Sequence, residues 1–384
     1  MKKLLLIFLF MIFIKGTVEG APNVEAQGAI LIEESTGRIL WEKNGHKQMA
    51  MASTTKIMTA IIALENGNLS DTVTVSKKAA ISPKVKMNLS TGEEIKLEYL
   101  LYALMLQSYN DAAVAIAEHV GGSVDEFCRL MTQKAKEIGA YETSFETPSG
   151  LDGENHYSTP YDMALIARYA LKNPEFIKIT NTRSLGVSSD KKSYSLVNKN
   201  RLLDQMQGAK GVKTGFTGKA GHCFVGAVEQ NDMGLISVVL GSGWGGNRNQ
   251  KWVDTKEILN FGFDTFQYMP IVQALSPAKD IDVYRARKSN LPLIFAEGLE
   301  LPLSQEEYRG LRVTVAAPGA IAAPVKKGQT VGIGKVYINN KLEKEIPLIA
   351  TEDIARHDLK TSMEKVLNAW FDLAGTGDIE LPEF

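Results

Sequence analysis

Residues 52–64 read ASTTKIMTAIIAL, a short polar turn followed by a long apolar run. Beyond its first turn the segment is apolar almost all round, which is typical of a helix buried inside a domain. Ser53 and Lys56 stand three positions apart, so a helix places the hydroxyl and the amine on one face. Burial lowers the pKa of such a lysine toward that of a usable base. The stretch therefore predicts a buried helix that begins with a nucleophile and its base.

The Ser-x-x-Lys spacing is weak evidence by itself, because short patterns recur by chance. Four further copies occur, at Ser188/Lys191, Ser189/Lys192, Ser276/Lys279 and Ser362/Lys365. Only the copy at Ser53 lies on an apolar helix, so it is the one expected to be chemically active.

A second polar motif, Ser108-Tyr109-Asn110, interrupts two apolar helical segments, residues 97–106 and 111–120. A serine hydroxyl can relay protons, and an asparagine amide can both donate to and accept from a peptide substrate. An isolated tripeptide of this kind is more often a plain turn in which Asn110 or Asp111 caps the next helix. The tripeptide becomes evidence for a catalytic site only together with the motifs before and after it in the sequence.

The third motif, Lys213-Thr214-Gly215-Phe216-Thr217, opens a β-rich region, and Lys-Thr-Gly occurs once in the chain. Glycine lets a substrate backbone approach the strand edge, the threonines can bind a carboxylate, and the lysine places charge near the nucleophile. Three motifs in this order, each in a suitable element, leave chance a poor explanation.

The remaining patterns predict the architecture. Residues 28–41 form two apolar runs around Ser35-Thr36-Gly37, typical of a β-hairpin, and Thr159-Pro160 is a helix start. Strands at 28–41 and 211–240, with helices between them and another at 251–263, suggest one mixed sheet packed against helices, plus a helical insert. Short β runs beyond Leu275-Ser276-Pro277 predict a small all-β domain, and residues 357–373 an amphipathic helix.

The N-terminus predicts export. Two lysines precede an unbroken apolar run, Leu4 to Ile14, which is too short to span a bilayer but suits a secretory signal. Small residues near Ala21 supply a cleavage point, so the mature chain is expected to begin around Ala21 or Pro22. An uncleaved anchor is the alternative.

Composition excludes several classes of function. Lys and Arg total 43 against 44 Asp and Glu, so nothing indicates binding to nucleic acid. The two cysteines, Cys128 and Cys223, are expected to be packed thiols rather than a disulfide framework. No metal-binding spacing occurs among the cysteines and five histidines, so neither a metal nor a cofactor is expected.

The ordered motifs resemble those of the serine penicillin-binding enzymes and serine β-lactamases. Longer stretches resemble the low-molecular-mass D-alanyl-D-alanine carboxypeptidases more specifically, and the likeness covers nearly the whole mature chain. These stretches are residues 48–60, 108–118, 149–152, 156–159, 162–164 and 211–217, with residues 324–332 similar to the β-rich C-terminal domain of that family. The final helix is similar to the membrane-surface helix of the family.

The resemblance implies a transpeptidase-type domain, an antiparallel sheet packed with helices plus a helical subdomain, followed by a small all-β domain and an amphipathic helix. The expected parts are a signal peptide at 1–21, a catalytic domain at 22–274, a β-rich domain at 275–355, and a helix and tail at 356–384. The implied substrate is a peptidoglycan stem peptide ending in D-Ala-D-Ala, with β-lactams as acylating ligands. The implied location is the outer face of the cell membrane or the cell wall.

The family mechanism implies a role for each matching residue. Ser53 is the expected nucleophile and Lys56 the general base, Ser108 and Lys213 pass a proton to the leaving D-alanine, and Asn110 holds the substrate amide. The oxyanion hole is expected from the N–H groups of Ser53 and Phe216. Substrate contacts are expected from Thr214, Gly215, Phe216, Thr217, Lys251, Arg248 and His156, with His156 more positional than catalytic.

Two positions depart from the family pattern. Tyr109 stands where glycine is usual, and Lys251 stands where an arginine binds the terminal carboxylate. Lysine binds a carboxylate without the two-pronged geometry of arginine. Arg248, one turn earlier, is the alternative partner.

Two other functions compete with this interpretation. A serine β-lactamase needs a further base, often in a Glu-x-x-Leu-Asn segment between the second and third motifs, and that spelling occurs here only at residues 364–368. A non-hydrolytic penicillin-sensing or wall-binding domain would not need every polar residue of the three motifs. For residues 357–373, docking on the β domain competes with binding to a membrane surface.

Overall fold

The computed structural model describes residues 20–244, 246–357 and 359–374. The predicted signal segment therefore lies almost wholly outside the described residues. The described chain divides after Phe266 into two compact units. The division comes earlier in the chain than the Leu275–Pro277 segment.

A five-stranded sheet organises the first unit, in the order β2-β1-β9-β8-β7. Its strands are β1 (Gly28–Glu33), β2 (Ile39–Lys43), β7 (Ala209–Thr217), β8 (Gly221–Gln230) and β9 (Met233–Ser242). Every neighbouring pair is antiparallel, so the mixed sheet suggested by the strand pattern is wrong. Short turns join β1 to β2 and β7 to β8 to β9, and such turns connect antiparallel neighbours. The predicted N-terminal hairpin and the antiparallel sheet implied by the family resemblance are confirmed.

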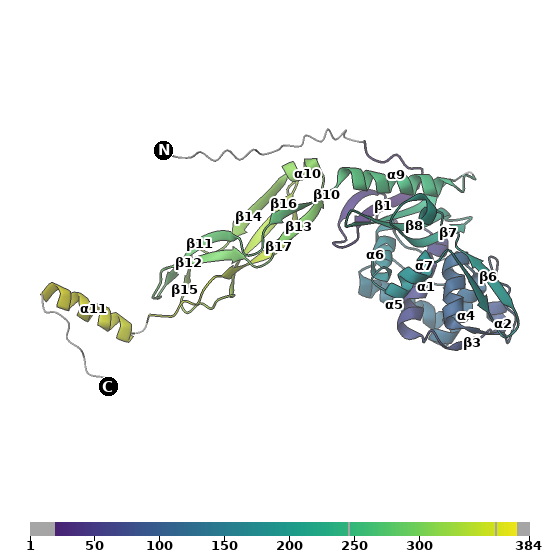
Figure 1. The fold of residues 1–384 in the computed structure, drawn as a ribbon, viewed down its shortest axis with the longest axis horizontal. Helices are drawn as coiled ribbons and strands as arrows, with labels where there is room; N and C mark the ends of the chain where they lie inside the picture. The colour runs from purple at the N-terminus through teal and green to yellow at the C-terminus, as the bar shows by residue number, and fades with distance from the viewer. Residues whose placement is uncertain (1–19, 245, 358, 375–384) are drawn as a thin grey trace, which may run out of the picture. The chain divides into compact units, whose positions relative to one another are not determined.

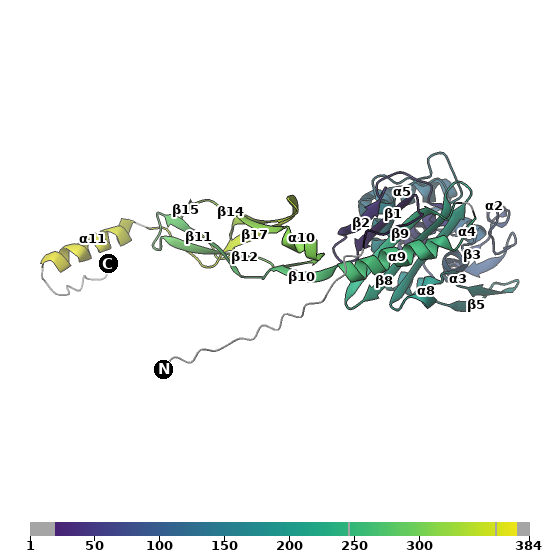
Figure 2. The same ribbon diagram turned by 90° about the horizontal axis from the view of Figure 1, so that it is seen from above.

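Helices cover both faces of this sheet (Figures 1 and 2). Helix α9 (Gln250–Thr265) packs on β8 and β9. The opposite face carries a helical cluster, which explains why β1 and β9 are buried along their whole length. The main helices of this cluster are α1 (Lys56–Asn66), α4 (Asn110–Gly121), α5 (Val124–Ile138), α6 (Pro160–Ala170) and α7 (Pro174–Asn181).

Smaller elements complete the first unit. A 3-10 turn, Ala52–Thr55, precedes α1, and α3 (Leu97–Tyr102) runs into a π-helical turn, Ala103–Gln107. Two small antiparallel sheets flank the helices, β3 (Thr72–Thr74) with β4 (Glu94–Lys96), and the hairpin of β5 (Ser184–Ser188) and β6 (Ser193–Val197). The short helices are α2 (Lys77–Ala80) and α8 (Leu202–Gln205).

Local sequence explains where two of the helices begin and end. Thr159 accepts a hydrogen bond from the Asp162 N–H with Pro160 in the first turn of α6, which confirms the predicted start. Ser123 caps α5 in the same way, and Gly139 ends it in the left-handed conformation. Sequence patterning did not separate α5 as a helix.

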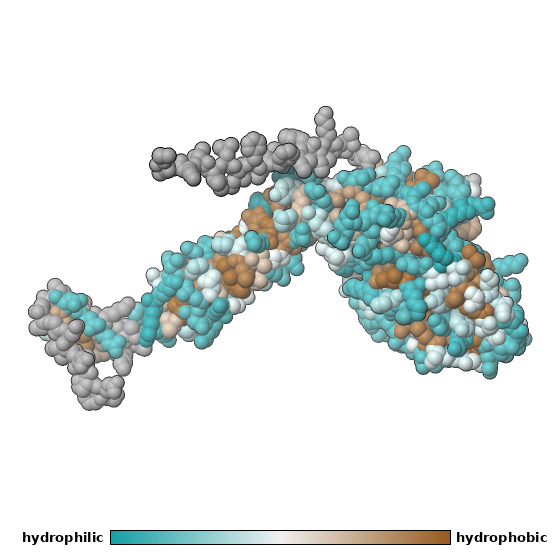
Figure 3. Space-filling view, viewed as in Figure 1, coloured by the Kyte–Doolittle hydropathy of each residue, from teal (hydrophilic) through white to brown (hydrophobic). Residues whose placement is uncertain are grey.

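The second unit is rich in strands, as expected. A six-stranded sheet has the order β14-β16-β17-β12-β11-β15, and β10 pairs with β13 in a separate sheet. The strands are β10 (Gln267–Val272), β11 (Pro277–Tyr284), β12 (Asn290–Phe295), β13 (Leu299–Leu303), β14 (Leu311–Ala316), β15 (Ala320–Ala322), β16 (Thr330–Ile338) and β17 (Lys341–Ala350), with helix α10 (Gln305–Arg309) between β13 and β14. Figure 3 shows apolar residues in separate patches on a mainly hydrophilic surface.

A final helix, α11 (Leu359–Ala374), confirms the C-terminal helix expected from the apolar spacing. Four of its described apolar side chains are exposed, Met363, Val366, Leu367 and Trp370. None of the helices in the described ranges has the length and hydropathy needed to cross a bilayer.

Candidate active site

The turn that precedes α1 presents the predicted nucleophile. Ser53 lies in the 3-10 turn, and Lys56 begins α1 with its side chain fully buried. The Lys56 Nζ donates to Ser53 Oγ at 3.0 Å and to Asn110 Oδ1 at 2.8 Å. The predicted base therefore contacts the nucleophile and the end of the second motif directly.

A backbone carbonyl completes the surroundings of this amine. The Ser149 carbonyl accepts from Lys56 Nζ at 2.5 Å and from Ser53 Oγ at 3.3 Å. The next residue, Gly150, has φ +83°, and a Cβ there would lie 2.0 Å from the Ala52 carbonyl oxygen. Only glycine permits that approach. The sequence did not predict the role of the Ser149 carbonyl, because every residue has a backbone carbonyl and no residue type marks this one.

Asn110 also ties a loop to the site. Its Nδ2 donates to the carbonyls of Pro83 and Lys84, and its N–H donates to the Val85 carbonyl at 2.7 Å. The neighbouring Asp111 carboxylate accepts from two further N–H groups, of Met87 and Leu89. The start of α4 thus fixes the loop that forms one wall of the cleft.

Ser108 occupies the turn between the π-helical segment and α4 in a left-handed conformation, φ 67°. Its Oγ is buried and has no hydrogen-bond partner among the described residues, which suits a group that meets a substrate. Two hydrogen bonds from Lys199 hold this turn in place. The Lys199 N–H donates to the Leu106 carbonyl and its Nζ to the Gln107 carbonyl, each at 3.2 Å.

Strand β7 forms the opposite wall with the third motif. Lys213 is buried, and its Nζ donates to the Thr214 carbonyl at 3.0 Å. Gly215 passes so close to the nucleophile turn that a Cβ would lie 2.9 Å from the Ser53 nitrogen. Phe216 is 59% exposed. Glycine is therefore required where the strand edge meets the Ser53 backbone.

Burial and like charges hold both lysine amines toward the neutral form. Desolvation and the nearby Lys213 charge set the pKa of Lys56 well below its usual range, against a smaller opposite effect of Asp111. Desolvation, helped by Lys199, lowers the pKa of Lys213 to about 7. A neutral Lys56 amine can accept the Ser53 proton.

The end of the cleft beyond β7 is basic. Burial, with Arg201 and Arg248 nearby, lowers the pKa of Lys251 to about 8, and its Nζ donates to the Arg248 carbonyl at 2.7 Å. His222, whose ring lies 4.5 Å from that of Phe216, lines the same region. Thr217 donates to the Asp152 carboxylate at 2.9 Å.

These walls enclose a cleft of about 340 Å³ that brings most of the predicted residues together. Ser53, Ser108, Asn110, Thr214, Gly215, Phe216, Thr217, Arg248 and Lys251 all line it. Residues that line it without a sequence signal include Lys84, Val85, Lys199 and His222. None of the described lining residues is acidic.

Three predicted residues, Lys56, Lys213 and His156, are buried and are not among the residues that line the cleft. Of these, His156 lies against the 3-10 turn that contains Ser53. Its Nε2 lies 2.9 Å from Thr55 Oγ1, and its Nδ1 accepts from the Glu146 N–H at 3.0 Å. The imidazole is enclosed by protein, and the expected substrate contact of His156 stays a prediction.

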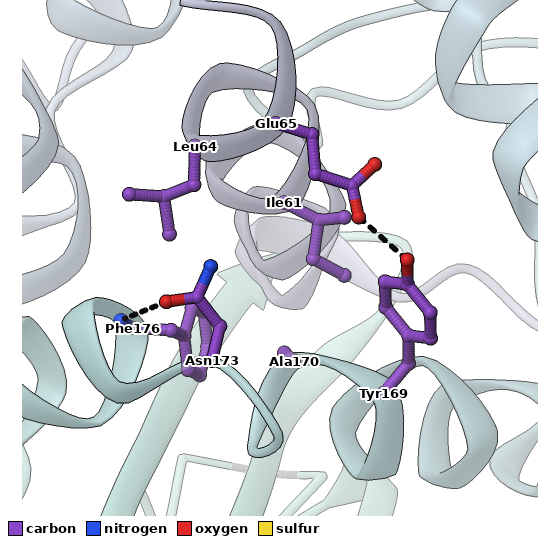
Figure 4. Close-up of a pocket in the computed structure, with 7 residues that line it drawn as sticks. All are labelled: Ile61, Leu64, Glu65, Tyr169, Ala170, Asn173 and Phe176. Atoms are coloured by element: carbon purple, nitrogen blue, oxygen red, sulfur yellow. Dashed lines mark hydrogen bonds between the residues drawn. The ribbon is translucent and has the colours of Figure 1, made fainter. Parts of the chain in front are cut away.

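A smaller cavity of about 20 Å³ lies at the other end of α1 (Figure 4). Its lining is mainly apolar, and Glu65 there is paired with the Tyr169 hydroxyl at 2.6 Å and with Lys134 at 2.9 Å. With room for little more than a water molecule, it offers no substrate site. The described residues contain no group of three His, Cys, Asp or Glu side chains placed to hold a metal ion, and both cysteines are buried free thiols.

Comparison with known proteins shows to which family the chain belongs. Residues 15–243 match the family model described as Peptidase_S11, D-alanyl-D-alanine carboxypeptidase, and residues 266–356 match the penicillin-binding protein 5 C-terminal domain. The chain is 34% identical to the D-alanyl-D-alanine carboxypeptidase DacF of Bacillus subtilis, covering 90% of each chain. It is 32% identical to DacC of Escherichia coli, covering 88% of this chain and 86% of that one.

A solved structure agrees in both units. Penicillin-binding protein 5 from Haemophilus influenzae has a TM-score of 0.74 at 28% identity, covering 88% of this chain and 100% of that one. Fold, motifs and relatives lead to one conclusion: the chain belongs to the Peptidase S11 family and is a serine-type D-alanyl-D-alanine carboxypeptidase of the low-molecular-mass penicillin-binding class.

Proposed function

We propose that Ser53 forms the acyl-enzyme by which this carboxypeptidase removes the terminal D-alanine from peptidoglycan stem peptides ending in D-Ala-D-Ala. The observation that carries the proposal is the buried Lys56 amine, 3.0 Å from Ser53 Oγ and oriented by the Ser149 carbonyl. Penicillin acylates the same hydroxyl.

The bond changes follow from this geometry. Lys56 takes the Ser53 proton as Oγ bonds to the carbonyl carbon of the penultimate D-alanine. The N–H groups of Ser53 and Phe216 stabilise the oxyanion. The C–N bond then breaks, and Ser108 with Lys213 passes the proton taken from Ser53 to the departing amine of D-alanine. Water then attacks the ester: its oxygen bonds to the acyl carbon, the bond to Ser53 Oγ breaks, and a proton of the water restores the Ser53 hydroxyl as the shortened peptide leaves as a carboxylic acid.

The terminal carboxylate binds at the basic end of the cleft. Thr214 offers a hydroxyl there, Thr217 can offer one by exchanging its hydrogen bond to Asp152, and Lys251 offers an ammonium in place of the two-pronged guanidinium. Arg248 is more exposed and is the second partner. Since no described lining residue is acidic, no carboxylate stands ready to activate the deacylating water, which favours a carboxypeptidase over a fast β-lactamase.

The enzyme acts outside the cytoplasm, and we propose that α11 holds it on the membrane surface. Its exposed Met363, Val366, Leu367 and Trp370 have the character of an interfacial helix. Full burial of one such side chain stabilises by about 1.5–3 kcal/mol, so partial burial of four contributes several kcal/mol. That exposure favours a membrane surface over docking on the strands of the second unit.

Replacing the nucleophile tests the central step. Ser53→Ala is expected to abolish both covalent labelling by fluorescent penicillin and release of D-alanine from a stem pentapeptide, because no other hydroxyl in the described part of the chain is hydrogen-bonded to the Lys56 amine. Ser188→Ala, in an exposed copy of the same spacing, is the matched control and should label normally. Labelling that persists in Ser53→Ala would move the nucleophile elsewhere.

The charge of Lys199 tests the protonation of Lys213. A nearby cation disfavours a second one, so Lys199→Met should raise the pKa of Lys213. The part of the pH–acylation profile that reports the titration of Lys213 should then move to higher pH. A shift of roughly half a unit, or about 0.7 kcal/mol, is expected. Lys199→Arg keeps the charge and should keep the profile. Identical profiles for Met and Arg would contradict this electrostatic coupling.

The carboxylate partner is tested with two substrates. Lys251→Ala should slow cleavage of a peptide with a free terminal carboxylate and affect an amidated peptide much less. Lys256→Ala, on the same helix but outside the cleft lining, is the control. An equal loss with both peptides would remove Lys251 from this role.

Membrane binding is tested by truncation after His357, which keeps the bridge between Ala286 and Arg356. With the signal peptide shown to be removed, the truncated enzyme is expected in the soluble fraction with full D-alanine release. Trp370→Glu in the full-length chain should also weaken membrane association, as the truncation does. A processed, truncated enzyme that still sediments with membranes would exclude α11 as the anchor.

A further inference from the structure

His156 is a buried titratable group that the reaction steps above do not use. Its side chain is 3% exposed and lies between the start of α1 and the loop of residues 146–156. Phe145 packs against the imidazole edge-on, with 5.9 Å between ring centroids. The ring is therefore held by contacts from both segments.

The hydrogen bonds define one tautomer. Nδ1 accepts from the Glu146 N–H, so it carries no proton, and the proton of the neutral ring is on Nε2. Nε2–H then donates to Thr55 Oγ1, whose own hydroxyl donates to the Ala52 carbonyl at 2.8 Å. This relay joins the loop to both ends of the 3-10 turn that contains Ser53.

The same loop supplies the carbonyl that orients the base. Ser149 accepts from both Lys56 and Ser53, and the Pro148 carbonyl accepts from Thr59 Oγ1 at 2.6 Å. Gly150 lies directly against the Ala52 carbonyl. Any movement of this loop relative to the turn therefore changes the position of the Lys56 acceptor.

We propose that His156 is a positioning residue of the acyl-transfer centre, which locks the Ser149 carbonyl against the nucleophile turn through its Nε2–H contact with Thr55. The inference rests on the roles proposed for Ser53 and Lys56. His156 touches neither substrate nor the reacting atoms and acts through the loop.

The surrounding charges agree with a neutral ring. The charged groups that act on His156 are Glu146 and Asp152 of its own loop, Lys56 of α1, and Lys219 after β7. Burial outweighs the two carboxylates and lowers the pKa of His156 to about 4. At neutral pH the Nδ1 acceptor is kept, whereas a proton there would face the Glu146 N–H.

Substitutions at His156 separate its two contacts. In His156→Asn the amide oxygen can accept near the Nδ1 position, but the side chain is too short to reach Thr55. In His156→Gln the longer amide can donate to Thr55 as Nε2–H does. The readout is the rate constant of penicillin acylation in the full chain, scaled to the fraction that labels at completion, so loss of folded protein does not change it.

His156→Asn is expected to slow acylation by on the order of tenfold to a hundredfold, because small displacements of a catalytic group have effects of that size. His156→Gln should recover most of the rate. Thr55→Val, which removes only the hydroxyl, should reproduce the defect, Thr55→Ser should rescue it, and the double variant should be no slower than either single one.

The outcomes distinguish this inference from the function on which it rests. Wild-type acylation by both His156→Asn and Thr55→Val overturns the positioning role. If His156→Asn fails to fold, Thr55→Val alone decides, and an additive double variant counts against a shared contact. Labelling of Ser53→Ala in the same assay would instead overturn the proposed nucleophile.

Discussion

The site depends on keeping one lysine amine out of water and close to a serine hydroxyl. A fully buried ammonium without partners would cost several kcal/mol, so the fold must either neutralise Lys56 or satisfy its N–H groups. Burial and the nearby Lys213 disfavour the charge, and Asn110 and Ser149 accept the two N–H groups of the neutral amine, which leaves its lone pair for the Ser53 hydroxyl 3.0 Å away. The helical cluster, strand β7 and the loop of residues 146–156 are arranged around this requirement.

The contact between Ser53 and Lys56 was predictable because the two residues are only three positions apart in the sequence. Ser53 and Lys56 lie on one helix, and the second and third motifs combine rare residue types in a fixed order. Apolar patterning also predicted the N-terminal hairpin and the C-terminal helix. The chain direction of each strand was not predictable from patterning, which is why a mixed sheet was inferred where the structure is antiparallel.

The rest of the site could not be predicted because it rests on backbone groups and on contacts far apart in sequence. The Ser149 carbonyl has the chemistry of every peptide bond, and only the fold places it beside Lys56. His222 and Lys199 line the cleft without a motif around them. His156 was expected at the substrate, yet the same residue type serves equally well as a buried hydrogen-bond link.

Ser53, Asn110 and the Ser149 carbonyl come from three segments of the chain that meet only when α1, α4 and the loop of residues 146–156 have packed together. A partly folded molecule has the serine but not the assembled amine, and a free serine hydroxyl is a weak nucleophile. With Ser53 as the proposed nucleophile, covalent capture by a β-lactam would count native molecules, and the chain would carry its own stoichiometric probe of folding.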